Sequence, residues 1–86
     1  EEEKGDFEDA VESFSIAIDL KPDHADYYLH RAGASIKNKQ YYDAVSDLYR
    51  ALDIAPYSSD ARELLQIAYS HIDAEEQGRS LSESGH

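Results

Sequence analysis

The sequence lacks cysteine, methionine and tryptophan, and it contains only two prolines and four glycines among 86 residues. Without cysteine the chain can form neither a disulfide framework nor a thiolate zinc site, so the usual supports of very small domains are excluded. No apolar run approaches the roughly 18 residues of a membrane span, and the opening Glu1-Glu2-Glu3-Lys4 is unlike a signal peptide. We therefore expect a soluble, cytoplasmic chain with room for a single small domain.

Basic residues are scarce as well. Eight Lys and Arg residues stand against 19 Asp and Glu residues, which gives a formal net charge of −11. The acid excess lies in residues 1–12 and 59–86, whereas the middle of the chain is nearly neutral. Phosphate backbones and anionic membrane surfaces bind clusters of cations, so this composition argues against nucleic acid and membranes as partners. A hydrophobic fraction of 41% is too high for a chain that is disordered throughout.

What the sequence does contain is an internal repeat with a period of 34 residues. Self-similarity at a fixed period is the signature of a repeat architecture, so it takes precedence over the assignment of single elements. The aligned pairs are Phe7 with Tyr41, Asp9 with Asp43, Ala10 with Ala44, Val11 with Val45, Phe14 with Leu48, Ala17 with Ala51, Ile18 with Leu52, Asp19 with Asp53, Leu20 with Ile54 and Pro22 with Pro56.

The apolar residues of both copies predict amphipathic helices. Within residues 7–20 and again within 41–54 they follow the i, i+3, i+4, i+7 spacing of one helix face. Each stretch stops before a proline, Pro22 or Pro56, which removes a backbone donor and restricts the preceding residue. Both prolines are therefore expected in turns between helices.

Two further helices are expected between and after these stretches. Residues 24–37 form one, and residues 38–40 form the turn that follows it. The other begins near residue 59 and ends near residue 77, with polar residues around one side, as a helix that closes an array needs. Short polar side chains accept hydrogen bonds from the unpaired amides of a first turn. We expect such caps at Asp23 for the first helix and at Ser58, Ser59 and Asp60 for the second.

These residues resemble the tetratricopeptide repeat, a family built on a 34-residue helical hairpin. The resemblance covers about residues 5–77, and it implies an all-α fold in which antiparallel helix-turn-helix hairpins stack as a short superhelical solenoid with a C-terminal capping helix. The full unit carries the family pattern as Tyr28, Ala32, Tyr41, Ala44, Leu48, Ala51 and Pro56, and the preceding unit carries its second half as Gly5, Phe7, Ala10, Phe14, Ala17 and Pro22.

The resemblance divides the chain into a repeat fragment, residues 1–77, and a flexible polar tail, residues 78–86. The fragment consists of a half repeat (1–22), a full repeat (23–57) and the capping helix (58–77). The first helix of the half repeat is reduced to residues 1–4, so we expect an excerpt of a longer array or a face covered by a second copy. That self-association face comprises Phe7, Val11, Phe14 and Ile18.

Two positions depart from the family pattern. Arg31 stands where the family usually has an apolar residue, and Ser35 stands where it often has a tyrosine. We expect the packing inside the full repeat to be looser or rearranged around these two side chains.

The resemblance implies a non-catalytic protein-protein interaction module, a scaffold or co-chaperone-like adaptor that binds a peptide or helix of a partner in its concave groove. Alternatives are that the fragment is a structural spacer or self-association segment of a longer array, and that the groove positions are merely solvated. Carried over position by position, the groove residues are Asp26, Leu29, His30, Gly33, Ile36, Lys37, Asp60, Glu63, Leu64, Ile67, Ser70 and His71.

The charges of these residues predict which ligand the groove prefers. Some members of the family hold the acidic C-terminal tail of heat-shock chaperones with a clamp of lysines, asparagines and an arginine. Here the matching positions carry Asp26, His30 and Asp60, and a carboxylate disfavours an acidic ligand. We therefore disfavour the chaperone tail and expect a basic or apolar protein segment, which the acidic groove attracts. The alternative is that the acidity only keeps the array soluble.

Catalytic and metal sites are not indicated. The four histidines, His24, His30, His71 and His86, have no spacing that places two on one helical turn, and the chain has no HExxH motif. The glycines are isolated, so no phosphate-binding loop is present. We expect no enzyme activity, no cofactor and no metal.

Overall fold

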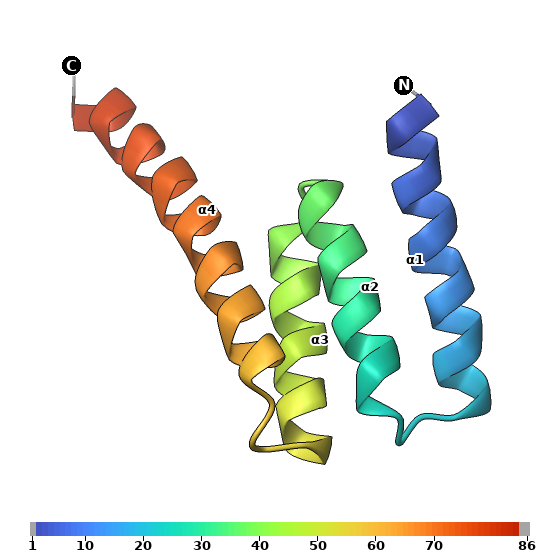
Figure 1. Cartoon of the computed structure of the whole chain (residues 1–86). Coiled ribbons are helices and arrows are strands. Elements are labelled where there is room, and N and C mark those ends of the chain that lie inside the picture. Colours follow the sequence, from blue (N-terminus) through green and yellow to red (C-terminus); the bar gives the residue numbers. More distant parts are fainter. Residues whose placement is uncertain (1, 85–86) are drawn as a thin grey trace.

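The computed structural model describes the backbone of residues 2–84 and the side chains of residues 6–76. These residues form four α-helices in the order α1 (Glu2–Leu20), α2 (Ala25–Lys37), α3 (Tyr41–Ile54) and α4 (Ser59–Ser84). Each helix runs antiparallel to the one before it (Figure 1). The predicted all-α fold of antiparallel helical hairpins is confirmed, whereas the superhelical course of a longer solenoid stays a prediction.

Helices that follow one another in the chain pack together, and α2 also contacts α4. Within the described residues α1 and α4 make no contact with each other, and Figure 1 shows them at opposite ends of the row of helices, with α2 and α3 between them. The burial of apolar surface between the helices is the main driving force for this packing. The core cluster consists of Ile18, Tyr28, Ala32, Ala44, Leu48, Ala51, Ala61 and Leu65.

The turn between α2 and α3 is a helix-capping motif of the Schellman type. The backbone N–H of Gln40 donates to the carbonyl of Ser35 at 2.8 Å, and that of Lys39 donates to the carbonyl of Ile36 at 3.0 Å. Lys39 adopts a left-handed conformation with a φ of 64°, the position at which glycine is usual. The predicted turn at residues 38–40 is therefore confirmed, and it places a lysine in a conformation that L-residues disfavour.

The helix caps follow the prediction at one end of the chain only. Ser58 is confirmed as a cap, because its Oγ accepts a hydrogen bond of 3.2 Å from the N–H of Ala61 in the first turn of α4. The cap at Asp23 is wrong: His24 holds the N-cap position of α2 in an extended conformation and makes no side-chain capping bond. Asp23 lies one residue too early, in the turn itself.

Two predicted helix ends are also wrong. Residues 2–4 are not a separate remnant, because α1 runs without interruption from Glu2 through Gly5. Likewise α4 continues past Gly78 to Ser84, so most of the predicted tail is part of this helix. Residues 85–86 of the predicted tail lie outside the described residues. The physical reason is that one glycine inside a helix costs only about 1 kcal/mol. Residues 2–20 and 59–84 contain no proline, and the structure places no left-handed residue within them, so the stronger stops are absent from both described helices.

Candidate partner-binding groove

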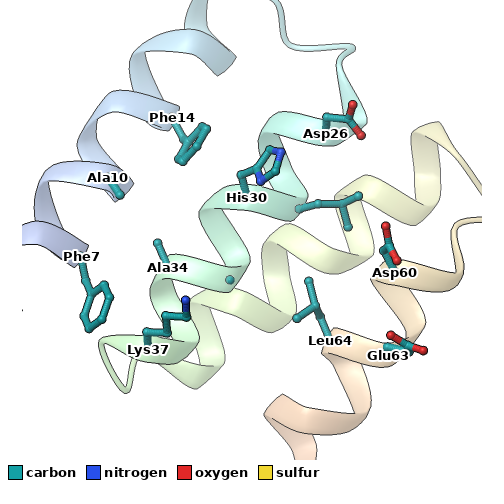
Figure 2. Close-up of a pocket in the computed structure, with 12 residues that line it drawn as sticks. Phe7, Ala10, Phe14, Asp26, His30, Ala34, Lys37, Asp60, Glu63 and Leu64 are labelled. Atoms are coloured by element: carbon teal, nitrogen blue, oxygen red, sulfur yellow. The ribbon is translucent and has the colours of Figure 1, made fainter.

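A groove of about 620 Å³ lies between α1 and α4, with α2 as its floor. Figure 2 shows side chains from all three helices pointing into this space. The groove exists because α1 and α4 both pack beside α2 without contacting each other. Its lining residues are Phe7, Ala10 and Phe14 from α1, Asp26, Leu29, His30, Gly33, Ala34 and Lys37 from α2, and Asp60, Glu63 and Leu64 from α4.

Most residues of the predicted groove line this space, and four do not. Ile36 packs against the hydrophobic core. His71 lies farther along α4, where its ring stacks on Tyr41 with 4.7 Å between the centroids. Ile67 and Ser70 are exposed and also lie beyond the groove. The predicted residues that the structure brings together there are Asp26, Leu29, His30, Gly33, Lys37, Asp60, Glu63 and Leu64.

The predicted self-association face is divided between the groove and the core. Phe7 and Phe14 line the groove, whereas Ile18 is buried in the core and only 8% exposed. Val11 is half-buried. The stripe is therefore covered only in part, because α2 packs against α1, and self-association through it stays a prediction. The apolar side chains that α1 does expose are Ile16, at 57%, and Leu20, at 78%.

Ring and cation contacts join the α1 wall to the floor. The rings of Phe14 and His30 stack with 5.3 Å between their centroids and an interplanar angle of 17°. At the other end of α2, the Nζ of Lys37 lies 6.0 Å from the centre of the Phe7 ring, within the range of a cation–π interaction. Figure 2 shows Phe14 next to His30 and Phe7 next to Lys37.

The charges of the groove are separated along its length. Asp26 stands in the first turn of α2 and Asp60 in the first turn of α4, and Glu63 follows one turn later. Lys37 stands at the opposite end, in the last turn of α2. All four side chains are exposed at the rim (Figure 2). The groove therefore has an apolar interior, one acidic end and one basic end.

A comparison with known proteins decides the family. The family model of the tetratricopeptide repeat matches residues 1–61. This chain belongs to the tetratricopeptide-repeat family. A "Protein SGT1 homolog" from Bos taurus is 42% identical over 52 residues, which cover 60% of this chain and 15% of the relative. A "Protein SGT1 homolog" from Oryza sativa subsp. japonica is 41% identical over 51 residues, which cover 59% and 14%.

The chain thus spans about one-seventh of the length of the curated relatives that it matches. No solved structure matches it at the same level of significance. The tetratricopeptide repeat is a protein-interaction fold, so the chain is a protein-interaction module in this general sense.

Gly33 forms an open depression in the floor of this tetratricopeptide-repeat groove. A Cβ atom built on Gly33 would meet no atom within 4 Å, and its backbone is an ordinary helix without a positive φ. An alanine at this position therefore meets no other part of the fold. A larger side chain would project into the groove, which makes Gly33 a useful site for blocking it.

Behind the groove, Arg31 departs from the family pattern by forming a hydrogen-bonded network. It donates to both carboxylate oxygens of Asp47 on α3 and, from Nη1, to the Oγ of Ser15 on α1 at 2.8 Å. Asp47 is only 7% exposed, and its hydrogen bonds raise the pKa of Arg31 above its ordinary value. Ser35, the other position that departs from the family pattern, is buried at 2% exposure. The packing around these two side chains is therefore rearranged rather than loosened.

Among the side chains that the structure describes, no three His, Asp or Glu residues come together in an arrangement that could ligate a metal ion. None of the helices in this part of the chain combines the length and the apolar character needed to cross a bilayer.

Proposed function

We propose that this chain binds a basic or apolar segment of a partner protein in the groove between α1 and α4, as the interaction module of an adaptor or scaffold. The observation that carries the proposal is the groove itself, an open channel with an apolar interior and charged rims. Concave sites of this composition, with mainly apolar walls and a few polar groups, are typical of ligand binding.

The charge at the rim supports a basic rather than an acidic ligand. Three carboxylates, from Asp26, Asp60 and Glu63, stand against the single ammonium group of Lys37. Complementary charges steer a ligand toward such a site and raise its association rate, whereas like charges penalise it. The same argument disfavours the acidic C-terminal tails of chaperones, which other members of the family bind with basic clamps.

The proposed role is non-catalytic. The groove carboxylates are exposed, whereas the acid and base groups of enzymes usually lie in desolvated clefts that shift their proton affinity. Asp26, Asp60 and Glu63 are better suited to contact the cationic side chains of a ligand.

Gly33 offers a sharp test, because it lines the groove and a Cβ atom added there points into open space, so we expect a bulky residue to extend into the groove. A random peptide library displayed on phage is selected against the chain, and the affinities of the selected peptides are measured by calorimetry. We expect peptides rich in lysine, arginine and apolar residues. Gly33→Trp should weaken their binding at least tenfold, whereas the control Gly33→Ala should leave it within twofold.

Two results would overturn the proposal. One is the selection of predominantly acidic peptides, which contradicts the charge argument. The other is equal binding to the Gly33→Trp and Gly33→Ala variants, which places the peptides elsewhere on the surface. Thermal unfolding of both variants shows whether each remains folded during the measurement.

The alternative function is that of a spacer or self-association segment. It is favoured by the exposure of Ile16 and Leu20, which lie four residues apart on one side of α1. If this pair joins two copies, Ile16→Asp should lower the mass measured by sedimentation equilibrium. Single exposed apolar side chains are common on monomers, so the groove remains the stronger proposal.

A further inference from the structure

The side chains that are oxidised most easily are missing from this chain. Cysteine, methionine and tryptophan are all absent, whereas tyrosine occurs seven times. In many proteins the sulfur atoms of cysteine and methionine are the first to react with an oxidant. Here the phenol of tyrosine is the side chain from which a one-electron oxidant removes an electron most readily. The fate of the resulting radical then depends on its exposure and on the group beside it.

Two tyrosines from neighbouring helices, Tyr49 of α3 and Tyr69 of α4, contact each other through their hydroxyl groups. The two oxygen atoms lie 2.7 Å apart, and either hydroxyl can be the donor of the hydrogen bond. Tyr49 is 53% exposed and Tyr69 is 41% exposed. A soluble oxidant can therefore reach both rings, and a radical formed on one ring lies in contact with the other phenol.

The packing of α3 against α4 holds this pair together. The residues that immediately precede the two tyrosines, Leu48 and Ala68, are fully buried, with 0% exposure each. Two helical turns away, the hydroxyl of Tyr42 on α3 donates to the carboxylate of Glu76 on α4 at 3.3 Å. The backbone on both sides of the pair is thus anchored, while the rings themselves can rotate at the surface.

Other tyrosines lack this combination of exposure and proximity. Tyr28 and Tyr41 are buried, with 6% and 9% exposure. Tyr57 is 91% exposed in the turn before α4, where it is accessible to other molecules. Exposure to an oxidant and a second phenol at hydrogen-bond distance are combined at Tyr49 and Tyr69.

From these observations we infer that Tyr49 and Tyr69 form a site of oxidative cross-linking, at which a one-electron oxidant joins the two rings and links α3 covalently to α4. The class of oxidant is the high-valent haem of a peroxidase, with hydrogen peroxide as the terminal oxidant. The inference goes beyond the proposed groove function and is independent of it.

The chemistry of the cross-link balances in atoms and electrons. Each phenol gives one electron to the oxidant and its hydroxyl proton to water, which leaves two neutral tyrosyl radicals. A carbon–carbon bond then forms between one ring carbon of each tyrosine, in both cases a carbon next to the one that bears the oxygen. The hydrogen on each linked carbon leaves as a proton, and each oxygen regains a proton, so both phenols are restored. The chain loses two hydrogen atoms, and one hydrogen peroxide is reduced to two molecules of water.

The geometry of the pair suits this product. In the cross-linked rings the two hydroxyl groups stand beside each other on either side of the new bond, and in the structure the two hydroxyls already lie side by side. The link closes the chain between residues 49 and 69, and it restricts the unfolded chain as a disulfide does. Because α4 also forms one wall of the groove, the link fixes that wall to α3.

The test is to oxidise the intact chain at low micromolar concentration with a haem peroxidase and hydrogen peroxide. We expect a product of monomeric size in denaturing gel electrophoresis, with the fluorescence of dityrosine and a mass lower by two hydrogen atoms. Trypsin cleaves after lysine and arginine, so the peptides 40–50 and 63–79 should be recovered as one linked species. The midpoint of thermal unfolding should rise by about 10 °C.

Three variants show which tyrosines are joined. Tyr49→Phe and Tyr69→Phe each remove one phenol and keep the ring, and each should lower the yield of the monomeric product at least tenfold. The matched control is Tyr57→Phe, which removes the most exposed phenol and should leave the yield within twofold. Circular dichroism checks that all three variants remain helical. Oxidation of the natural chain in concentrated urea, which separates α3 from α4, should also lower the yield at least tenfold.

Three results would overturn the inference. They are cross-links that form only between chains, a monomeric product that persists at full yield in the Tyr49→Phe variant, and an equal yield in the presence and absence of urea. None of these results depends on a ligand in the groove, so failure of the cross-link leaves the proposed groove function to its own test.

Discussion

The guanidinium of Arg31 binds the carboxylate of Asp47 through two hydrogen bonds, from Nε to Oδ2 at 2.8 Å and from Nη2 to Oδ1 at 2.7 Å. Such bidentate pairs are the strong form of a charge-assisted bond. A third bond from the same guanidinium reaches Ser15. One side chain of α2 therefore links α1 and α3, the two helices on either side of it.

Removing one member of this pair should destabilise the fold. Asp47→Ala leaves the guanidinium without its main partner, and breaking a buried pair in this way costs about 3–5 kcal/mol. Because the Arg31 side chain is 24% exposed, solvent screening reduces the expected loss to about 2–3 kcal/mol. Urea denaturation measures the free energy of unfolding. The matched control is Asp53→Ala, which removes an exposed carboxylate 3.5 Å from Arg50 and should cost below about 0.5 kcal/mol.

Replacing both charged partners is the complementary experiment. Arg31→Met with Asp47→Leu removes the pair without stranding a charge, and such replacements are often neutral or stabilising. The double variant should therefore recover most of the stability lost by Asp47→Ala. A single-variant loss no larger than that of the Asp53→Ala control would show that the network contributes little.

The left-handed Lys39 predicts a stabilising substitution. Glycine adopts a φ of 64° without the steric cost of a Cβ atom, a cost of about 1–2 kcal/mol for other residues. Lys39→Gly should raise the free energy of unfolding by about 1 kcal/mol, less a small loss from the greater entropy of glycine in the unfolded chain. Thermal unfolding monitored by circular dichroism measures the gain. Lys39→Ala removes the same side chain but keeps the Cβ atom, so a gain of equal size in that variant would contradict the explanation.

Two tyrosines on α3 and α4 predict a pH dependence at the alkaline end. The hydroxyls of Tyr49 and Tyr69 lie 2.7 Å apart, and this hydrogen bond raises the pKa of Tyr69 above its ordinary value. Because the pKa of Tyr69 is higher in the folded chain than in the unfolded chain, its protonated hydroxyl stabilises the fold. This stabilisation is fully present at pH values below the pKa of the unfolded chain, and it is lost as the pH rises through the pKa of the folded chain. Tyr49→Phe should move the pKa of Tyr69 back toward about 10. NMR titration of ring-labelled tyrosine measures the shift, and Tyr57→Phe, at a ring that is 91% exposed, is the control.

Much of the fold follows from the 34-residue register, and the exceptions have definite causes. The bounds of α2 and α3 agree with the apolar stripes, because prolines and the turn at residues 38–40 end those helices. Gly5 and Gly78 interrupt the pattern but not the helices, since their flanking residues carry the helix across them. The pair of Arg31 and Asp47 could not be predicted, because the two residues lie sixteen positions apart on different helices and share no periodicity.

The sequence predicts most of the groove residues on α2 but does not assign the residues of α1 to the groove. Periodicity shows which side of α1 is apolar, but it does not say whether that side faces another helix or open space. The sequence therefore predicts Phe7 and Phe14 as part of a surface for a second copy, whereas in the structure they line the groove. Ile67 and Ser70 share a stripe of α4 with Glu63, but they are not among the residues that line the groove in the structure.

The last prediction concerns the sign of charge that the groove selects. Asp60→Lys with Glu63→Lys reverses both carboxylates that α4 contributes to the groove. The double variant should bind lysine-rich peptides from the phage selection about tenfold more weakly, which corresponds to about 1.4 kcal/mol, and the difference should shrink as salt screens the exposed charges. Calorimetry at two salt concentrations measures both effects. The matched control is Asp73→Lys with Glu75→Lys, which makes the same change in net charge on exposed residues of α4 outside the groove. Equal weakening in the control would mean that the overall charge of the chain, rather than the groove, attracts the ligand.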